Sequence, residues 1–247
     1  MLAQRIRTPQ VRIVAIIVDN ASASPDREQL DRFTRGVPDI QIIRSEHNVG
    51  YFGGLNLGLE VIAPSSDDLV IIGNNDLKFA SDFCARLREA HYRDDVLVVC
   101  PDLCTVDGVH QNPHVLHRTG WLRRLKFDIY FSHYLSSIPA SWLARQLPRR
   151  RRRRNSPGSA GVINMGVGAC YVLLPRFLKA AKRLFFPGFL YGEEACLAWQ
   201  VRDAGGITWY DPSLKVNHAE SAACSKLPSR KAYEYGRESY WRYRHLL

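Results

Sequence analysis

Acidic and amide side chains directly follow two apolar runs of the chain. Asp19-Asn20 come after VRIVAIIV, and Asn74-Asn75-Asp76 come at the end of DLVIIGNND. A carboxylate with amides beside it can hold a divalent cation and leave the other coordination positions to phosphate oxygens and water. Asp and Asn also cap turns routinely, so each group taken alone is explained equally well as a turn. Two such groups on one rim of a fold favour a binding site only modestly.

Further candidates for chemistry lie nearer the C-terminus. Glu193 and Glu194 open a predicted helix after the aromatic-rich turn FFPGFLY. Adjacent acids at a helix start complement the helix dipole, which is the structural explanation. The functional explanation is that one carboxylate faces a cleft as a general base, with its pKa raised by the aromatic surroundings. His218 ends the last apolar segment and has the chemistry of a metal or phosphate ligand, although a lone histidine is more often structural.

A glycine-rich segment, HNVGYFGGLNLG (47–58), opens another predicted helix. Backbone N–H groups at a helix start can receive a phosphate group. The segment matches neither a Walker A motif nor a G-x-G-x-x-G fingerprint. On the glycines alone, a tight turn and close helix packing are therefore the better explanation.

The elements that must position these residues follow from the apolar pattern. Strands are predicted at 11–18, 39–45, 68–76 and 96–103, after a small-residue turn within 165–175, and at ITWYDP and LKVNH; helices are predicted at 25–35, 53–63, 83–92 and 193–205. Continuous apolar strands that alternate with helices are typical of an α/β fold with a mostly parallel sheet flanked by helices. Ligands of such sheets bind beyond the carboxyl ends of the strands, so Asp19 and Asp76 are expected on one rim.

The composition is that of an ordinary globular protein. The 247 residues are 46% hydrophobic and 23% charged, which suits one large domain. No apolar run reaches the roughly eighteen residues of a transmembrane helix, and the start MLAQRIRTPQ lacks the apolar segment of a secretory signal. The six cysteines form no Cys-x-x-Cys pair, which argues against a zinc site and predicts buried thiols of a cytoplasmic protein.

The net charge of +10 is concentrated in one basic stretch. Residues 118–154 hold eleven Lys and Arg and one Asp, and the rest of the chain is neutral. This stretch lies within 104–160, which shows no clear periodicity and is expected to be irregular. Three interpretations stay open for it: peripheral contact with an anionic membrane, a solvated loop, or non-specific nucleic-acid binding. No recognisable fold for specific nucleic-acid binding accompanies the arginines.

Four blocks occur together in the order of a known family. They are VDNAS (18–22), NVGYFGGLNLGL (48–59), IIGNNDL (71–77), and the pair GVGACYVLL (166–174) and FLYGEEACLA (189–198). On these blocks the chain resembles family 2 glycosyltransferases of the GT-A type, in the rhamnosyltransferase-like branch that builds bacterial surface polysaccharides of the cell envelope. The resemblance spans about residues 2 to 245. It implies a single GT-A domain over 1–247, made of a nucleotide-binding half (1–103), an irregular basic insertion (104–160), an acceptor and catalytic half (161–228) and a C-terminal surface helix (229–247).

The resemblance also implies roles by position. Asp19 resembles the residue that contacts the donor base. Asp76 matches the last acid of the metal motif and would bind Mg²⁺ or Mn²⁺ bridging the diphosphate, with His218 as a histidine near it. Glu194 matches the catalytic base, with Glu193 as its neighbour. The other implied contacts are Asn20, Asn48, Gly50, Asn56 and Asn75 on the nucleotide-sugar side, and Gly168, Ala169 and Tyr191 on the acceptor side.

The implied reaction is a metal-assisted displacement at the anomeric carbon with inversion. It would move a sugar from a nucleotide-diphosphate sugar to a glycan or lipid-linked acceptor, and Glu194 would take the proton of the acceptor hydroxyl. Three features depart from the family: a strand–helix unit is expected ahead of the first strand, the metal motif has a single acid, and Cys196 stands where an acid is common. These departures keep an alternative open, namely a truncated, inactive GT-A-like protein that binds a nucleotide or a partner.

Overall fold

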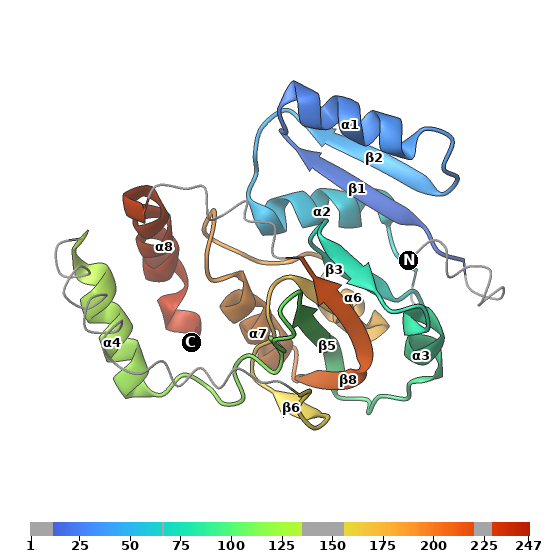
Figure 1. The fold of residues 1–247 in the computed structure, drawn as a ribbon. Coiled ribbons are helices and arrows are strands. Elements are labelled where there is room, and N and C mark those ends of the chain that lie inside the picture. Colours follow the sequence, from blue (N-terminus) through green and yellow to red (C-terminus); the bar gives the residue numbers. More distant parts are fainter. Residues whose placement is uncertain (1–11, 66, 135–155, 220–228) are drawn as a thin grey trace.

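The structure is a computed structural model that describes residues 12–65, 67–134, 156–219 and 229–247. Helices and strands alternate through the first part of the chain (Figure 1). The elements up to residue 105 are β1 (Ala15–Asn20), α1 (Ser24–Thr34), β2 (Ile40–Ser45), α2 (Tyr51–Ile62), β3 (Val70–Gly73), β4 (Leu77–Phe79), α3 (Phe83–Glu89) and β5 (Val96–Thr105). The later elements are α4 (Trp121–Ser132), β6 (Gly161–Ile163), β7 (Cys170–Leu173), α6 (Pro175–Ala180), α7 (Glu193–Asp203), β8 (Ile207–His218), α8 (Ser229–Tyr243) and a final 3₁₀ turn (Arg244–Leu246).

The strands form two sheets. Strands β1 and β2 pair in parallel as a separate two-stranded sheet, which lies above the main sheet in Figure 1. The main sheet has the order β3-β7-β5-β8-β4, with β6 added on β8. Helices flank these strands, so the α/β architecture expected from the sequence is confirmed.

The expectation of a mostly parallel sheet needs correction. Among the described strands, β1–β2 and β5–β8 pair in parallel, and the pairs β3–β7, β5–β7, β4–β8 and β6–β8 are antiparallel. The pattern could not reveal this, because a strand buried on both faces has the same apolar run whichever way its neighbours point.

Most predicted elements are confirmed, and four were missed. ITWYDP and LKVNH form one continuous strand, β8, whose pairing with β5 shifts register after Asp211. The stretch 104–160 was expected to be irregular, yet it contains α4. Two short strands, β4 and β6, and the six-residue helix α6 were also not predicted, because so few residues carry no readable period.

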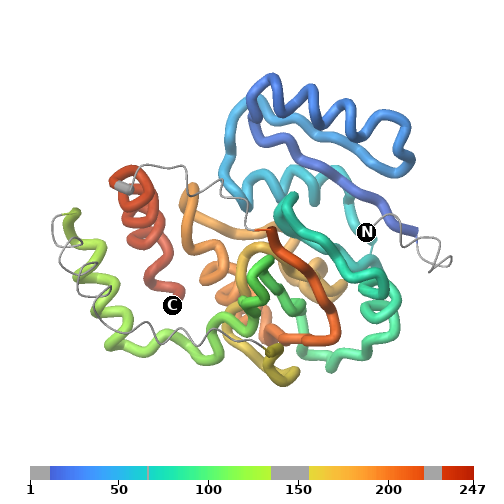
Figure 2. The backbone as a smooth tube through the Cα atoms, viewed as in Figure 1, coloured from blue at the N-terminus to red at the C-terminus, as the bar shows by residue number. Residues whose placement is uncertain are grey.

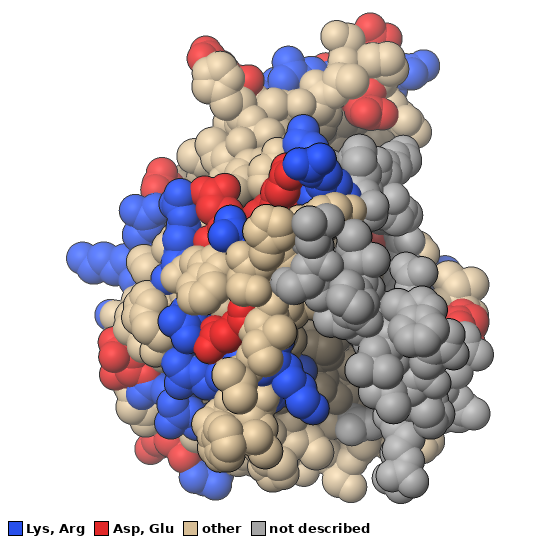
Figure 3. Space-filling model, turned by 90° about the vertical axis from the view of Figure 1, so that its left-hand side faces the viewer, with Lys and Arg blue, Asp and Glu red and all other residues tan. Residues whose placement is uncertain are grey.

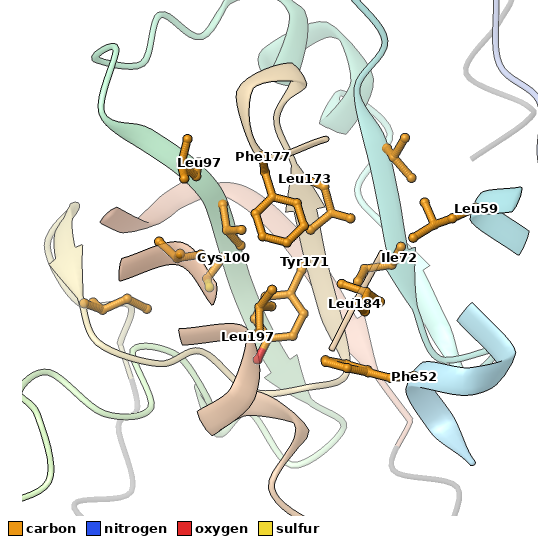
Figure 4. Packing of buried hydrophobic residues seen from close by; sticks show 14 of the residues in the cluster. Phe52, Leu59, Ile72, Leu97, Cys100, Tyr171, Leu173, Phe177, Leu184 and Leu197 are labelled. Carbon is orange, nitrogen blue, oxygen red and sulfur yellow. The ribbon is translucent and has the colours of Figure 1, made fainter. Parts of the chain in front are cut away.

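Two layers of apolar side chains cover the faces of the main sheet. One includes Tyr171, Leu173 and Phe177 with Phe52 from α2 and Leu184 (Figure 4). The other includes Phe83, Val99 and Leu103. Neighbouring residues of β5, such as Val98 and Val99, belong to different layers because successive side chains of a strand point to opposite faces.

The cysteines within the described ranges are free thiols. Cys84, Cys100, Cys170 and Cys196 are buried, as expected, whereas Cys104 is only half-buried. Burial raises the pKa of the Cys170 thiol to about 12, so this thiol stays protonated at neutral pH. Cys224 lies outside the described residues.

A helical pair made of α4 and α8 stands at one end of the molecule (Figure 2). Phe131 of α4 stacks on Tyr240 of α8 with ring centroids 4.8 Å apart, and Tyr130 meets Tyr233 edge-on at 5.6 Å. Arg124 donates to the carbonyl of Arg244, which ties α4 to the end of α8. Among the described helices, none is both long and apolar enough to cross a lipid bilayer.

Candidate active site

Asp76 and His218 meet at one end of the main sheet. Strand β3 ends at Gly73, and the turn that follows leads into β4, where Leu77 pairs with His218 of β8. This pairing brings the Oδ1 atom of Asp76 to 3.4 Å from the Nε2 atom of His218. The other ring nitrogen of His218 lies 2.8 Å from the side-chain oxygen of Gln111, which fixes the orientation of the imidazole. The sequence predicted that these two residues share a site, and the structure brings them together.

A carboxylate oxygen and an imidazole nitrogen at this spacing fit two ligands of one divalent cation. Within the described part of the chain, no group of three or more His, Cys, Asp or Glu side chains is arranged to hold a metal ion. A cation held by Asp76 and His218 would therefore need further oxygens from a bound diphosphate or from water. This agrees with the single acid of the motif Asn74-Asn75-Asp76, in which Asn75 is exposed beside Asp76.

The acid pair Glu193–Glu194 opens helix α7 after Gly192, which has a φ of +113°. A side chain at Gly192 would collide with the ring of Tyr243, so both the backbone conformation and the space require glycine there. The two acids have different surroundings. Glu193 is buried, and its desolvation, followed by the charge of Glu194, raises its pKa to about 7. Glu194 is half-buried and accepts a hydrogen bond from the backbone N–H of Gly168 at 3.2 Å.

The turn Gly168-Ala169 connects the acid pair to the Asp76 turn. Its Gly168 N–H holds Glu194, while its Ala169 carbonyl accepts a hydrogen bond of 2.9 Å from the N–H of Asn74. A Cβ at Gly168 would lie 2.8 Å from the Oε1 atom of Glu194, so glycine is needed for this close approach. Glu194, the Gly168-Ala169 turn, the Asn74–Asp76 turn and His218 are thus joined on one rim, which is built from β3, β7, β8 and α7.

Tyr51 is a site residue that the sequence reasoning missed. Its hydroxyl donates a 2.8 Å hydrogen bond to the carbonyl of Gly168, the residue whose N–H holds Glu194. Burial raises the pKa of Tyr51, and the negative charges of Glu194 and Asp76 act in the same direction. A tyrosine in the glycine-rich segment was the only signal in the sequence, because its partner lies 117 positions away.

Asn20, Asn48 and Gly50, predicted on the nucleotide side, do come together. The amide nitrogen of Asn20 donates to the side-chain oxygen of Asn48 at 3.1 Å and to the carbonyl of Gly50 at 3.0 Å. The side-chain oxygen of Asn20 accepts from the N–H of Val49 at 2.9 Å. Gly50 has a φ of +78°, and a Cβ there would lie 2.6 Å from the carbonyl oxygen of Phe189. These contacts fix the start of α2 against the end of β1, and contact of the same residues with a nucleotide stays a prediction.

Asp19 is occupied by internal partners. Its carboxylate is buried, accepts from the N–H of Ser22 at 2.8 Å, and lies 3.0 Å from Arg27 and 3.7 Å from Arg44. Desolvation of Asp19 would raise its pKa, but the hydrogen bonds from Ser22 and the two guanidinium groups outweigh it, and the pKa is lowered. The carboxylate is therefore ionised and holds the β1–α1 turn, while contact with a donor base stays a prediction.

Asn56 and Tyr191 also have protein partners. Both polar groups of the buried Asn56 side chain bond to the backbone of Leu184, at 2.9 and 2.8 Å. Asn56 therefore joins α2 to the segment before α7, and its place on the nucleotide side stays a prediction. Tyr191 has a φ of +70°, is exposed, and lies over Gly236 of α8. It flanks the acid pair, and its contact with an acceptor stays a prediction.

Comparison with known proteins finds similarity to glycosyltransferases. The family model described as "Glycosyl transferase family 2" matches residues 2–146, more than half of the chain. No curated protein sequence matches the chain. Among solved structures, GalNAc-T7 with UDP, GalNAc and Mn²⁺ superimposes with a TM-score of 0.62 and 14% identity, over 98% of this chain and 44% of that one. A mannosyltransferase from Pyrobaculum calidifontis in complex with GDP-Man and Mn²⁺ gives a TM-score of 0.50 and 14% identity, over 85% of this chain and 48% of that one.

At such low identity these structures establish the fold alone, and the fold is that of GT-A glycosyltransferases. The chain spans less than half the length of each of the two proteins.

Proposed function

Because the chain belongs to glycosyl transferase family 2, we propose that it transfers a sugar from a nucleotide-diphosphate sugar to an acceptor hydroxyl. The observation that carries the proposal is the convergence on one rim. Asp76 and His218 lie 3.4 Å apart there, and Glu194 is joined to the Asp76 turn through the Gly168-Ala169 turn. A pair of metal ligands and a carboxylate from another element are the two parts that an assisted displacement of a diphosphate requires.

The residues act in the reaction as follows. The acceptor oxygen attacks the anomeric carbon from the face opposite the diphosphate, so that a new C–O bond forms, the bond to the diphosphate oxygen breaks, and the configuration inverts. Glu194 takes the proton of the acceptor hydroxyl, and the Gly168 N–H keeps its carboxylate in place. Asp76 and His218 would hold Mg²⁺ or Mn²⁺, which supplies charge stabilisation for the leaving nucleoside diphosphate.

The finer assignments belong to the same proposal. The domain is a single GT-A unit over residues 1–247, with the donor side before residue 104 and the acceptor side from 161 to 228. The acceptor is a glycan or a lipid-linked glycan of bacterial surface polysaccharide synthesis, and the sugar is a hexose of the rhamnose type. The enzyme works in the cytoplasm, at the inner face of the plasma membrane. The sequence blocks that resemble the rhamnosyltransferase-like branch support these points.

Calorimetry with UDP, GDP and dTDP, with and without Mn²⁺, tests the donor site. We expect Mn²⁺ to strengthen binding of one diphosphate at least tenfold, and the variant Asp76→Ala to lose this dependence. The matched control is Asp203→Ala, which removes an exposed acid at the far end of α7 and should bind as the unchanged protein does. Absence of binding with every nucleotide would overturn the proposal in favour of an inactive GT-A-like protein that binds another partner.

A second variant separates chemistry from binding. Glu194→Gln keeps the size of the side chain and its hydrogen bond with Gly168 but removes the base. We expect diphosphate affinity to stay within about twofold and transfer or donor hydrolysis to fall by about 10²-fold or more. Unchanged turnover in Glu194→Gln would remove this residue from the mechanism.

A further inference from the structure

Helix α4 exposes a stripe of large apolar side chains, the α4 stripe, made of Trp121, Leu122, Leu125 and Ile129. The exposed fraction of Trp121 is 72%, and the other three are each about half exposed or more. At 100° per residue the four lie within an arc of about 100° on the helix. A soluble helix normally turns such a stripe towards the core of its own protein.

The core-facing side of α4 is a different one. Phe127 and Phe131 point to α8, where both rings contact Tyr240. Asp128 accepts a 2.5 Å hydrogen bond from the Tyr240 hydroxyl and pairs with Arg244 at 2.8 Å. Helix α4 is therefore firmly attached to α8 by one side, and the α4 stripe faces away from that attachment.

Basic side chains lie beside the α4 stripe on α4 itself and on the neighbouring helix α8. Residues 118–132 and 229–247 together hold nine Lys and Arg against three Asp and Glu. Arg123 and Lys126 are exposed on α4 itself, and Arg230, Lys231 and Arg237 are exposed on α8. Figure 3, which looks at this end of the molecule, shows many Lys and Arg side chains with fewer acids between them. The partner that covers the α4 stripe should therefore have a negatively charged surface with an apolar layer under it.

We infer that the α4 stripe docks the protein on an anionic lipid bilayer. Trp and Leu side chains on one face, with Lys and Arg beside them, are the composition of helices that lie in the membrane interface. Four side chains are few for a stable protein interface, which uses about 20–30 residues a side. They suffice for a helix that inserts shallowly while nearby Lys and Arg are attracted to anionic headgroups.

Helix α8 connects the docking surface on α4 to the segment just before the acid pair. The Ser239 hydroxyl of α8 donates 2.7 Å to the carbonyl of Leu190, and the Tyr243 ring packs against Gly192, just before the acid pair. The α4 stripe and the start of α7, where Glu193 and Glu194 lie, are therefore connected through α8. This connection favours an acceptor that is linked to a lipid and presented from the membrane, a point that rests on the proposed function.

Cosedimentation with vesicles tests the docking without any assay of transfer. The full chain is mixed with vesicles of phosphatidylcholine alone and with vesicles that contain about one third phosphatidylglycerol. We expect binding to the anionic vesicles, a blue shift of tryptophan fluorescence that Trp121→Phe reduces, and at least a tenfold loss of affinity in Leu122→Ser/Leu125→Ser/Ile129→Ser. Because these positions are exposed, circular dichroism should stay unchanged in the triple variant.

Single substitutions provide the matched control. Trp121→Ser should weaken vesicle binding severalfold, whereas Phe33→Ser, at a side chain 71% exposed on α1, should leave it unchanged. Absence of binding to anionic vesicles would overturn the inference. So would vesicle binding that survives the triple variant but is lost when Arg149 to Arg154 are replaced by Ser, since charge alone would then carry it. A dimer in light scattering that the triple variant dissociates would assign the α4 stripe to a second copy instead. None of these outcomes depends on nucleotide binding or transfer.

Discussion

Glu193 and Glu194 are neighbours in the chain, yet the fold gives them different properties. Glu193 is buried with a pKa of about 7, against 4.5 for an ordinary glutamate, while Glu194 reaches the Gly168 N–H. Between these two pKa values the folded protein holds a proton that the unfolded chain has released. The free energy of unfolding should therefore fall as pH rises from about 5 to 8, by about 3 kcal/mol for this group.

The variant Glu193→Gln should remove that part of the pH dependence, because its side chain is neutral at every pH. Urea unfolding at pH 5 and pH 8 measures it: the variant should gain stability relative to the unchanged protein as pH rises. Glu60→Gln, which removes an exposed acid on α2, controls for the loss of one negative charge. If Glu193→Gln kept the full slope, burial of Glu193 would not be its cause.

At the scale of elements, the two-stranded sheet β1–β2 depends on other elements for its stability. Two strands alone are marginally stable, so this sheet depends on α2 and on the hydrogen bonds of Asn20. In Asn20→Ala we expect amide exchange in residues 15–45 to accelerate by tenfold or more, because three hydrogen bonds between β1 and the start of α2 are lost. Exchange in β5 and β8 should change little.

Hydrogen exchange followed by mass spectrometry measures both regions at once. Gln41→Ala, at an exposed position of β2, is the control and should leave the exchange of residues 15–45 unchanged. An equal acceleration in β5 and β8 would mean that the two sheets unfold as one unit, contrary to this expectation.

At the scale of the whole molecule, the α4–α8 pair supports the loop before α7. Tyr240 is buried between the two helices, so Tyr240→Ala should cost about 3–5 kcal/mol of unfolding free energy. Leu190 accepts a hydrogen bond from Ser239 of α8, and Gly192 packs against Tyr243 of α8. In Tyr240→Ala we therefore expect faster amide exchange of residues 186–194 and lower transfer activity. Diphosphate affinity should persist, because Asp76 and His218 are positioned by the pairing of β4 with β8 and by Gln111.

Phe177→Ala is the control for this prediction. Phe177 is fully buried in the apolar layer with Tyr171 and Leu173, so its loss has a similar cost at another place in the fold. It should lower overall stability without the selective exchange of residues 186–194. A loss of diphosphate affinity in Tyr240→Ala matching the loss of activity would show that the whole rim depends on α8.

The residues of the candidate site could be predicted to different degrees. The family resemblance placed Asp76 and His218 near each other, and the antiparallel pairing of Leu77 with His218 is what brings them together. Tyr51 could not be found, because its role exists only once Gly168 lies beside it. The bond of Asn56 to Leu184 could not be found for the same reason, because the two residues are 128 positions apart.

The sequence by itself determined the local features of this protein, which are its apolar strands, the helix starts, the glycine turns and the place of the charge. Hydrophobic periodicity and turn chemistry are properties of short segments, so a single sequence reveals them. Only the tertiary structure decided the antiparallel insertion of β7, the buried state of Glu193 and the outward face of α4. These depend on contacts between residues far apart in the chain, and the free energy of such contacts is set by what surrounds each side chain after packing.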